Sequence, residues 1–70
     1  MHLFYTRHAR RRLRQRGITE RDVEAVLANY EQVRDDAKGN RVYVGRPGGR
    51  RIKVVVDMRS NPWTVITAGD

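Results

Sequence analysis

Apolar residues recur at helical spacing in the first thirty residues and then at alternate positions further along the chain. Ala9 and Leu13 lie four residues apart. Val23, Val26 and Leu27 have the three-and-four spacing of one helix face. After residue 40, apolar side chains alternate with polar ones, which is the period of a half-buried strand. The pattern therefore predicts two helices followed by a β-sheet.

The first helix is predicted to begin after Thr6, a residue type that caps helix N-termini well, and to run from Arg7 to Gln15 or Arg16. Its apolar content is low, so we expect a surface helix with one narrow stripe turned inward. Gly17 can end it, because glycine adopts the left-handed conformation past a helix C-terminus without a steric clash.

The second helix is predicted from about Glu20 to Asn29. Thr19 can cap its N-terminus, and Asp22, three residues on, completes a capping box. The stop signal of one helix thus lies next to the start signal of the other. The two helices should therefore meet at a defined corner.

Short strands follow, separated by clusters of glycine, proline, asparagine, aspartate and serine. The predicted strands are Glu31–Arg34, Arg41–Arg46, Arg51–Met58 and Trp63–Ala68. Short turns between successive strands require antiparallel pairing. We predict one α+β domain over residues 1–70, in which two N-terminal helices pack on one face of a three- to four-stranded antiparallel β-meander.

Charge is unevenly distributed in this chain of net charge +7. Residues 1–16 hold six arginines and no acid, and residues 37–59 hold seven basic residues and one acid. Residues 17–36, in contrast, hold six acids and two arginines. A one-sided basic surface favours a polyanion partner, most often nucleic acid. An arginine-rich surface that serves only solubility is the alternative.

Several other classes are not expected. The chain has no cysteine, which excludes disulfides and thiolate metal sites and fits a cytoplasmic protein. It has no apolar run of the ~20 residues that a membrane span needs. His2 and His8 alone do not make a set of metal ligands, and the glycines near residue 48 lack the features of a phosphate loop. We expect no metal ion and no cofactor.

The chemistry that these residues allow is RNA cleavage by attack of the RNA's own 2′-hydroxyl. It needs a base, cations on the phosphate and an acid for the leaving oxygen, but no metal. His8 is the candidate base, because the helix dipole and neighbouring arginines favour its neutral form. Lys53, on the open face of the predicted central strand, can reach a phosphate. For both residues an ordinary surface role is the alternative.

Further residues are candidates for contact with the nucleic acid backbone or bases. Basic side chains crowd the first helix and the hairpin around residue 48. Tyr43, expected on the open face, and Trp63 can both stack on bases. For Trp63 a place in the core is an alternative of at least equal weight. The predicted nucleic-acid-binding residues are Arg10, Arg11, Arg16, Tyr43, Arg46, Arg50 and Arg51.

Several short segments resemble one family. They are His8-Ala9-Arg10, Arg12, Arg16-Gly17-Ile18-Thr19, Lys53-Val54-Val55 and Val65-Ile66-Thr67. Over nearly its whole length the chain is similar to a small bacterial domain family of unknown function. That family is thought to share the fold of RelE/ParE-like toxins and of the Barnase–EndoU–colicin–RelE ribonucleases.

The resemblance implies a metal-independent endoribonuclease or RNA-directed toxin of a toxin–antitoxin-like system. Its site would comprise a helix histidine, basic residues on that helix and on the sheet, and a hydroxyl on the last strand. The matching positions are His8, Arg12, Lys53 and Thr67.

Two other functions remain open at this point. One is a non-catalytic module in which arginines bind RNA phosphates. The other is a toxin-like interaction domain held by an acidic antitoxin protein.

Overall fold

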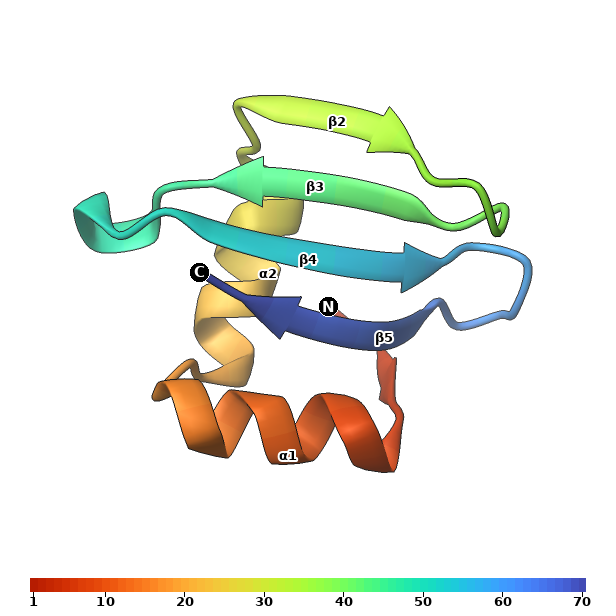
Figure 1. The fold of residues 1–70 in the computed structure, drawn as a ribbon, viewed down its shortest axis with the longest axis horizontal. Helices are drawn as coiled ribbons and strands as arrows, with labels where there is room; N and C mark the ends of the chain where they lie inside the picture. The colour runs from red at the N-terminus through yellow and green to blue at the C-terminus, as the bar shows by residue number, and fades with distance from the viewer.

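The protein folds as a five-stranded mixed sheet with two helices, in a computed structural model that describes all of residues 1–70 (Figure 1). The helices are α1 (Arg7–Arg16) and α2 (Glu20–Ala28), and the strands are β1 (Phe4–Tyr5), β2 (Gln32–Asp35), β3 (Arg41–Gly45), β4 (Ile52–Asp57) and β5 (Thr64–Gly69). The sheet order is β1-β5-β4-β3-β2. The α+β class and the boundaries of both helices and of the four predicted strands are confirmed to within one residue.

The prediction of a purely antiparallel meander is wrong, because β1 adds a parallel strand. Phe4 and Tyr5 pair with Thr64 and Val65 of β5. The other strand pairs are antiparallel. A two-residue strand is too short to show an alternating pattern in the sequence. It is recognised as a strand only from its pairing with β5, about sixty residues further along the chain.

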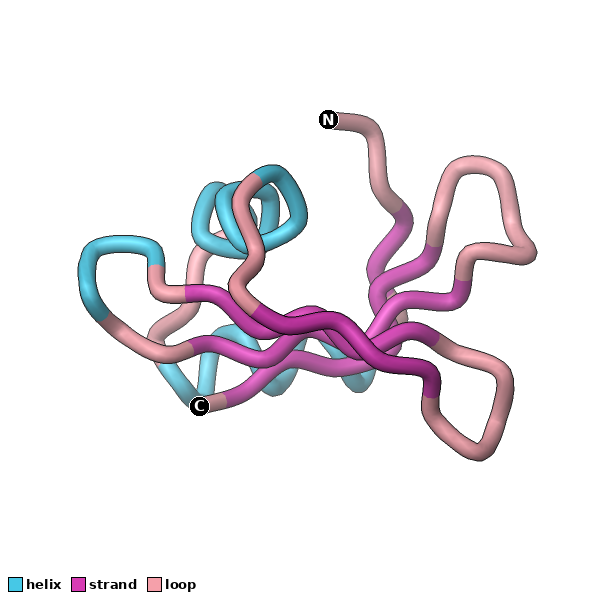
Figure 2. Tube along the Cα trace, turned by 90° about the horizontal axis from the view of Figure 1, so that it is seen from above, coloured by secondary structure: helices cyan, strands magenta, loops and turns pink.

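The two helices occupy different positions around the sheet. Figure 2 shows α2 over one face, whereas α1 lies along the β5 edge. Helix α1 contacts β5 and β1, and α2 contacts β3 and β4. The expectation that both helices pack on the same face is therefore wrong for α1.

The hydrophobic core lies between α2 and the sheet. Ile52, Val54 and Val56 alternate along β4 and are buried against Val23 and Val26 of α2. Burying one such side chain contributes roughly 1.5–3 kcal/mol. The inward stripe of α1 joins the same cluster through its two apolar residues.

The predicted helix caps are present. The Thr19 hydroxyl accepts from the backbone N–H of Asp22, and the Asp22 carboxylate accepts from that of Thr19, each at 3.0 Å. Gly17 ends α1 with a φ of 64°, in the left-handed region. The corner between the helices is thus specified by local hydrogen bonds.

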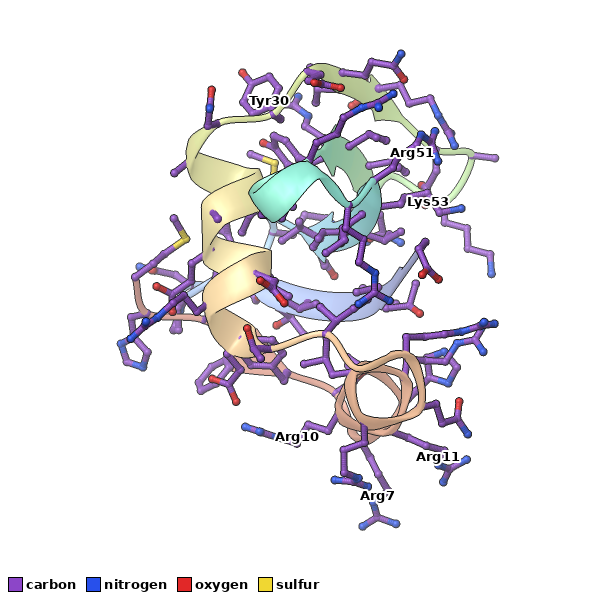
Figure 3. All side chains as sticks on the ribbon, turned by 90° about the vertical axis from the view of Figure 1, so that its left-hand side faces the viewer. Arg7, Arg10, Arg11, Tyr30, Arg51 and Lys53 are labelled. Carbon is purple, nitrogen blue, oxygen red and sulfur yellow. The ribbon has the colours of Figure 1, made fainter.

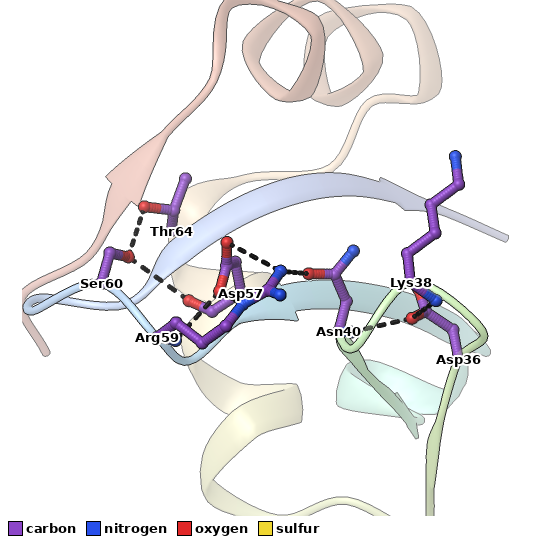
Figure 4. A network of polar contacts seen from close by, with 7 residues as sticks. All are labelled: Asp36, Lys38, Asn40, Asp57, Arg59, Ser60 and Thr64. Carbon is purple, nitrogen blue, oxygen red and sulfur yellow. Dashed lines mark hydrogen bonds and ion pairs between the residues drawn. The ribbon is translucent and has the colours of Figure 1, made fainter.

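A polar network closes the end of the sheet where β4 leads into β5 (Figure 4). The Arg59 guanidinium donates to the Asp57 carboxylate at 2.9 Å and to the side-chain oxygen of the buried Asn40 at 3.2 Å. The Asp36 carboxylate accepts from the backbone N–H groups of Asn40 and Lys38. These hydrogen bonds hold the pKa values of Asp36 and Asp57 below their usual range. The network joins the loop before β3 to the loop between β4 and β5.

Neither helix is long and apolar enough to cross a membrane.

Tyr5 provides a test of the packing between β1 and the helices. Its hydroxyl is buried without a hydrogen-bond partner, and burial, followed by the charges of Glu20 and Glu24, raises its pKa to about 12. An unsatisfied buried hydroxyl costs about 1–3 kcal/mol. Tyr5→Phe should therefore leave the free energy of unfolding at pH 7 unchanged or raise it by about 1 kcal/mol in urea titrations.

The same substitution should change the response to alkali. An unfolded chain ionises this tyrosine near pH 10.0, whereas the folded protein keeps it neutral up to about pH 12. The native protein should therefore lose stability across that window, and Tyr5→Phe should lose less. A loss of more than 1 kcal/mol at pH 7 would mean that the hydroxyl has a stabilising partner.

Candidate functional site

Helix α1 is tied to β5 at its first turn through Thr6. The Thr6 hydroxyl accepts from the backbone N–H of Ala9 at 3.0 Å and donates to the carbonyl of Ile66 at 3.1 Å. Ile66 is the extra residue of a β-bulge, which is why its carbonyl is free to accept. This double contact fixes the start of α1 beside Thr67.

His8 lies next to Thr67 as a result. Its Nε2 is 3.3 Å from the Thr67 hydroxyl oxygen, and the ring is otherwise exposed. Thr67 pairs with Val55, on the sheet face opposite α2. The hydroxyl therefore orients the imidazole at the rim of the open face.

A hollow of about 140 Å³ lies beside this pair. Arg12 and Arg16 of α1 and Lys53 of β4 line it, together with the end of β5 from Thr67 onward. Drug-sized ligands occupy pockets of roughly 300–1,000 Å³. A volume of this size instead suits a few water molecules or one phosphate group. Three of the four predicted catalytic residues thus line one hollow, and His8 is hydrogen-bonded to one of them.

The hollow is electropositive. Arg12, Arg16 and Lys53 form no ion pair within the protein. The Nε of Arg12 is also buried without a hydrogen-bond partner. The only acid at the hollow is Asp70, whose pKa is lowered by the hydrogen bond from Arg50. An anion that enters would meet three unpaired cations and one carboxylate that is already compensated.

Arg50 stabilises the other end of α1. Its guanidinium donates to the carbonyls of Arg16 and Gly17, the latter at 3.1 Å, and to the Asp70 carboxylate at 2.7 Å. These carbonyls are among the unpaired groups at a helix C-terminus. The prediction that Arg50 binds nucleic acid is therefore not supported, since its donors are engaged within the fold. No local sequence pattern indicates this contact, which spans 33 residues.

Other predicted phosphate-binding arginines divide into two groups. Arg10 pairs with Glu20 at 3.2 Å and Arg46 pairs with Glu31 at 3.1 Å, so both are compensated. Figure 3 shows Arg10 on the α2 side of α1. Arg11 and Arg51 are exposed without ion pairs, and Figure 3 shows Arg51 beside Lys53 on the opposite side. Of these predicted arginines, Arg51 is thus an unpaired cation on the side that holds the hollow.

The prediction that Tyr43 stacks on bases is wrong. Tyr43 is only 6% exposed and packs edge-on against Tyr30, with ring centroids 4.9 Å apart. It pairs with Val54, so it faces α2 rather than the open face. Trp63 is partly buried against the core. The sequence correctly predicted that neighbouring side chains of β3 point to opposite faces of the sheet. It assigned Tyr43 to the open face, whereas Tyr43 lies on the face covered by α2.

No group of three or more histidine, aspartate or glutamate side chains is arranged to hold a metal ion.

Arg50 can be tested against its neighbour. Arg50→Ala removes two hydrogen bonds to main-chain carbonyls and should lower the free energy of unfolding by about 1–2 kcal/mol, after allowance for partial exposure. Arg51→Ala removes the same charge without an intramolecular contact and should change it by less than about 0.5 kcal/mol. Urea unfolding of both variants makes the comparison. Equal effects would contradict the role of Arg50 as a helix tie.

The comparisons with known proteins identify a family. One family model, described as Domain of unknown function (DUF4258), matches residues 5–70. Searches of curated proteins and of solved structures found no match. The matched range includes both helices, strands β2 to β5, the second residue of β1 and every residue that lines the hollow. The chain belongs to the DUF4258 family.

Proposed function

We propose that the protein is a metal-independent endoribonuclease, a toxin-like module of the RelE/ParE kind. The observation that carries the proposal is the gathering of His8, Arg12, Lys53 and Thr67 at one small cationic hollow. These residues come from three different elements, α1, β4 and β5. Solubility alone requires only exposed charges. It does not explain why an imidazole, a hydroxyl and unpaired cations lie together at a site of the size of one phosphate.

The proposed reaction begins with the 2′-hydroxyl of RNA. Thr67 holds the imidazole, and the unprotonated nitrogen of His8 accepts the 2′-hydroxyl proton. The 2′-oxygen then bonds to phosphorus, and the bond from phosphorus to the 5′-oxygen breaks. The products are a 2′,3′-cyclic phosphate and a 5′-hydroxyl.

The cations supply the remaining requirements. Arg12 binds the non-bridging phosphate oxygens, whose negative charge grows as the new bond forms. Lys53 donates a proton to the leaving 5′-oxygen. The proton that His8 accepted then passes through water to Lys53, so both residues return to their starting states. No metal ion takes part in these steps.

The second candidate is a non-catalytic RNA-binding module. It is favoured by one observation, that His8 is the only imidazole at the hollow. A lysine side chain holds its proton more tightly at neutral pH than an imidazolium does, which disfavours proton donation to the leaving oxygen. Binding without cleavage would need only the cations.

The test compares the two histidines of the chain. Labelled RNA is incubated with purified protein in the presence of a metal chelator. His8→Ala should slow cleavage about 10²- to 10⁴-fold, the usual contribution of a general base. His2→Ala is the matched control, because His2 lies at a separate hollow with Leu3 and Trp63. It should cleave at the native rate.

The outcomes separate the two candidates. Cleavage should leave 2′,3′-cyclic phosphate ends, and RNA methylated at the 2′-oxygen should bind and remain intact. Equal cleavage by the His8 and His2 variants, or dependence on a divalent ion, would refute the mechanism. RNA that is bound but intact after long incubation would establish the non-catalytic candidate.

A further inference from the structure

We propose that the ligand is a single strand of RNA that lies lengthwise along β5, in a channel between α1 and β4. This inference rests on the proposed function for the identity of the polyanion as RNA. Its geometric basis is separate, because it concerns the shape and charge of the surface around the hollow rather than the chemistry of His8.

The channel has a floor of small residues. Strand β5 lies between β4 on one side and α1 on the other. On the face opposite α2, β5 presents Thr67, opposite Val55, and Gly69, opposite Lys53. Gly69 has no side chain, and no atom lies within 4 Å of the position where a Cβ would be. The floor is therefore lower than the walls, which carry long basic side chains.

The walls carry two rows of positive charge. On α1, His8, Arg12 and Arg16 follow one another at one-turn intervals, a rise of roughly 6 Å each. On the opposite wall, Arg51 directly precedes β4 and Lys53 lies within it. The two residues are roughly 6.6 Å apart along an extended chain. Both intervals are close to the phosphate repeat of an extended nucleic-acid strand.

The directions of the elements bring the two rows into register. Figure 1 shows α1 and β5 running the same way, and β4 is antiparallel to β5. Arg16 and Arg51 therefore lie at one end of the channel and His8 at the other. The reacting phosphate would lie between Arg12 and Lys53, and its neighbour between Arg16 and Arg51.

The channel favours a single strand over a duplex. A hollow of about 140 Å³ admits one backbone phosphate, whereas a double helix presents a broad and rigid surface. Recognition should also depend little on sequence. Base stacking needs exposed aromatic rings, but Tyr43 is buried in the core and Trp63 is partly buried against it.

Binding of an uncleavable ligand tests the channel apart from any activity. A 2′-O-methyl RNA oligonucleotide of mixed sequence, single-stranded or annealed to its complement, is titrated by fluorescence anisotropy at several salt concentrations. The single strand should bind more tightly than the duplex. Equal or tighter binding of the duplex would overturn the proposal.

Two variants address the floor and the wall. Gly69→Val adds methyl groups where the structure has open space, so the fold should persist while affinity for the single strand falls by about tenfold or more. Arg51→Ala should reduce the slope of log affinity against log salt by about 0.7, the value for one contact to a single strand. Circular dichroism verifies the fold of each variant.

Arg34→Ala is the matched control for Arg51→Ala. Arg34 is also exposed without an ion pair, but it lies on β2, at the far edge of the sheet. Its removal should leave the slope unchanged. Equal slopes for the Arg34 and Arg51 variants would mean diffuse electrostatic binding and would overturn the proposal, even if Gly69→Val does not fold.

The two proposals can fail separately. If the channel variants lose binding but the native protein never cleaves RNA, the channel stands and the nuclease activity does not. If folded Gly69→Val retains native binding and His8-dependent cleavage, the activity stands and the channel is wrong.

Discussion

The contact between Thr6 and the β5 bulge determines the arrangement of everything around the hollow. One hydroxyl caps α1 through Ala9 and binds the spare carbonyl of Ile66. The cap is a local feature, whereas the bulge belongs to the last strand, sixty residues away. Because the same oxygen serves both, the start of the helix cannot move along β5 without losing a hydrogen bond. Arg50 provides the corresponding restraint at the helix C-terminus.

Helix α1 needs such restraints because its own sequence supports it weakly. It carries six arginines among ten residues and buries only Ala9 and Leu13. Like charges three or four residues apart on a helix repel each other. A helix of this composition and length would be marginal in isolation. Docking on β5 stabilises it and concentrates positive charge beside the sheet, which is the property that the proposed function uses.

The sharing of arginines between fold and surface explains why net charge alone was a poor guide to the site. Arg10, Arg46 and Arg50 are each paired with an acid, and Arg50 also binds backbone carbonyls. What remains unpaired on the open side includes Arg12 and Lys53. Sequence reasoning assigned all five residues to RNA or its cleavage, because it had no means of knowing which cations meet an acid in the folded chain.

The sequence by itself determined the features that depend on neighbouring residues. The capping residues, the helical spacing and the alternation in the strands placed both helices and four strands, since each is set by contacts within a few residues. Only the tertiary structure decided the features that depend on distant partners. These include the parallel pairing of β1, the position of α1 at an edge, and the side of the sheet that Tyr43 faces. Alternation specifies that neighbouring side chains face opposite ways, but the packing of α2 decides which way is inward.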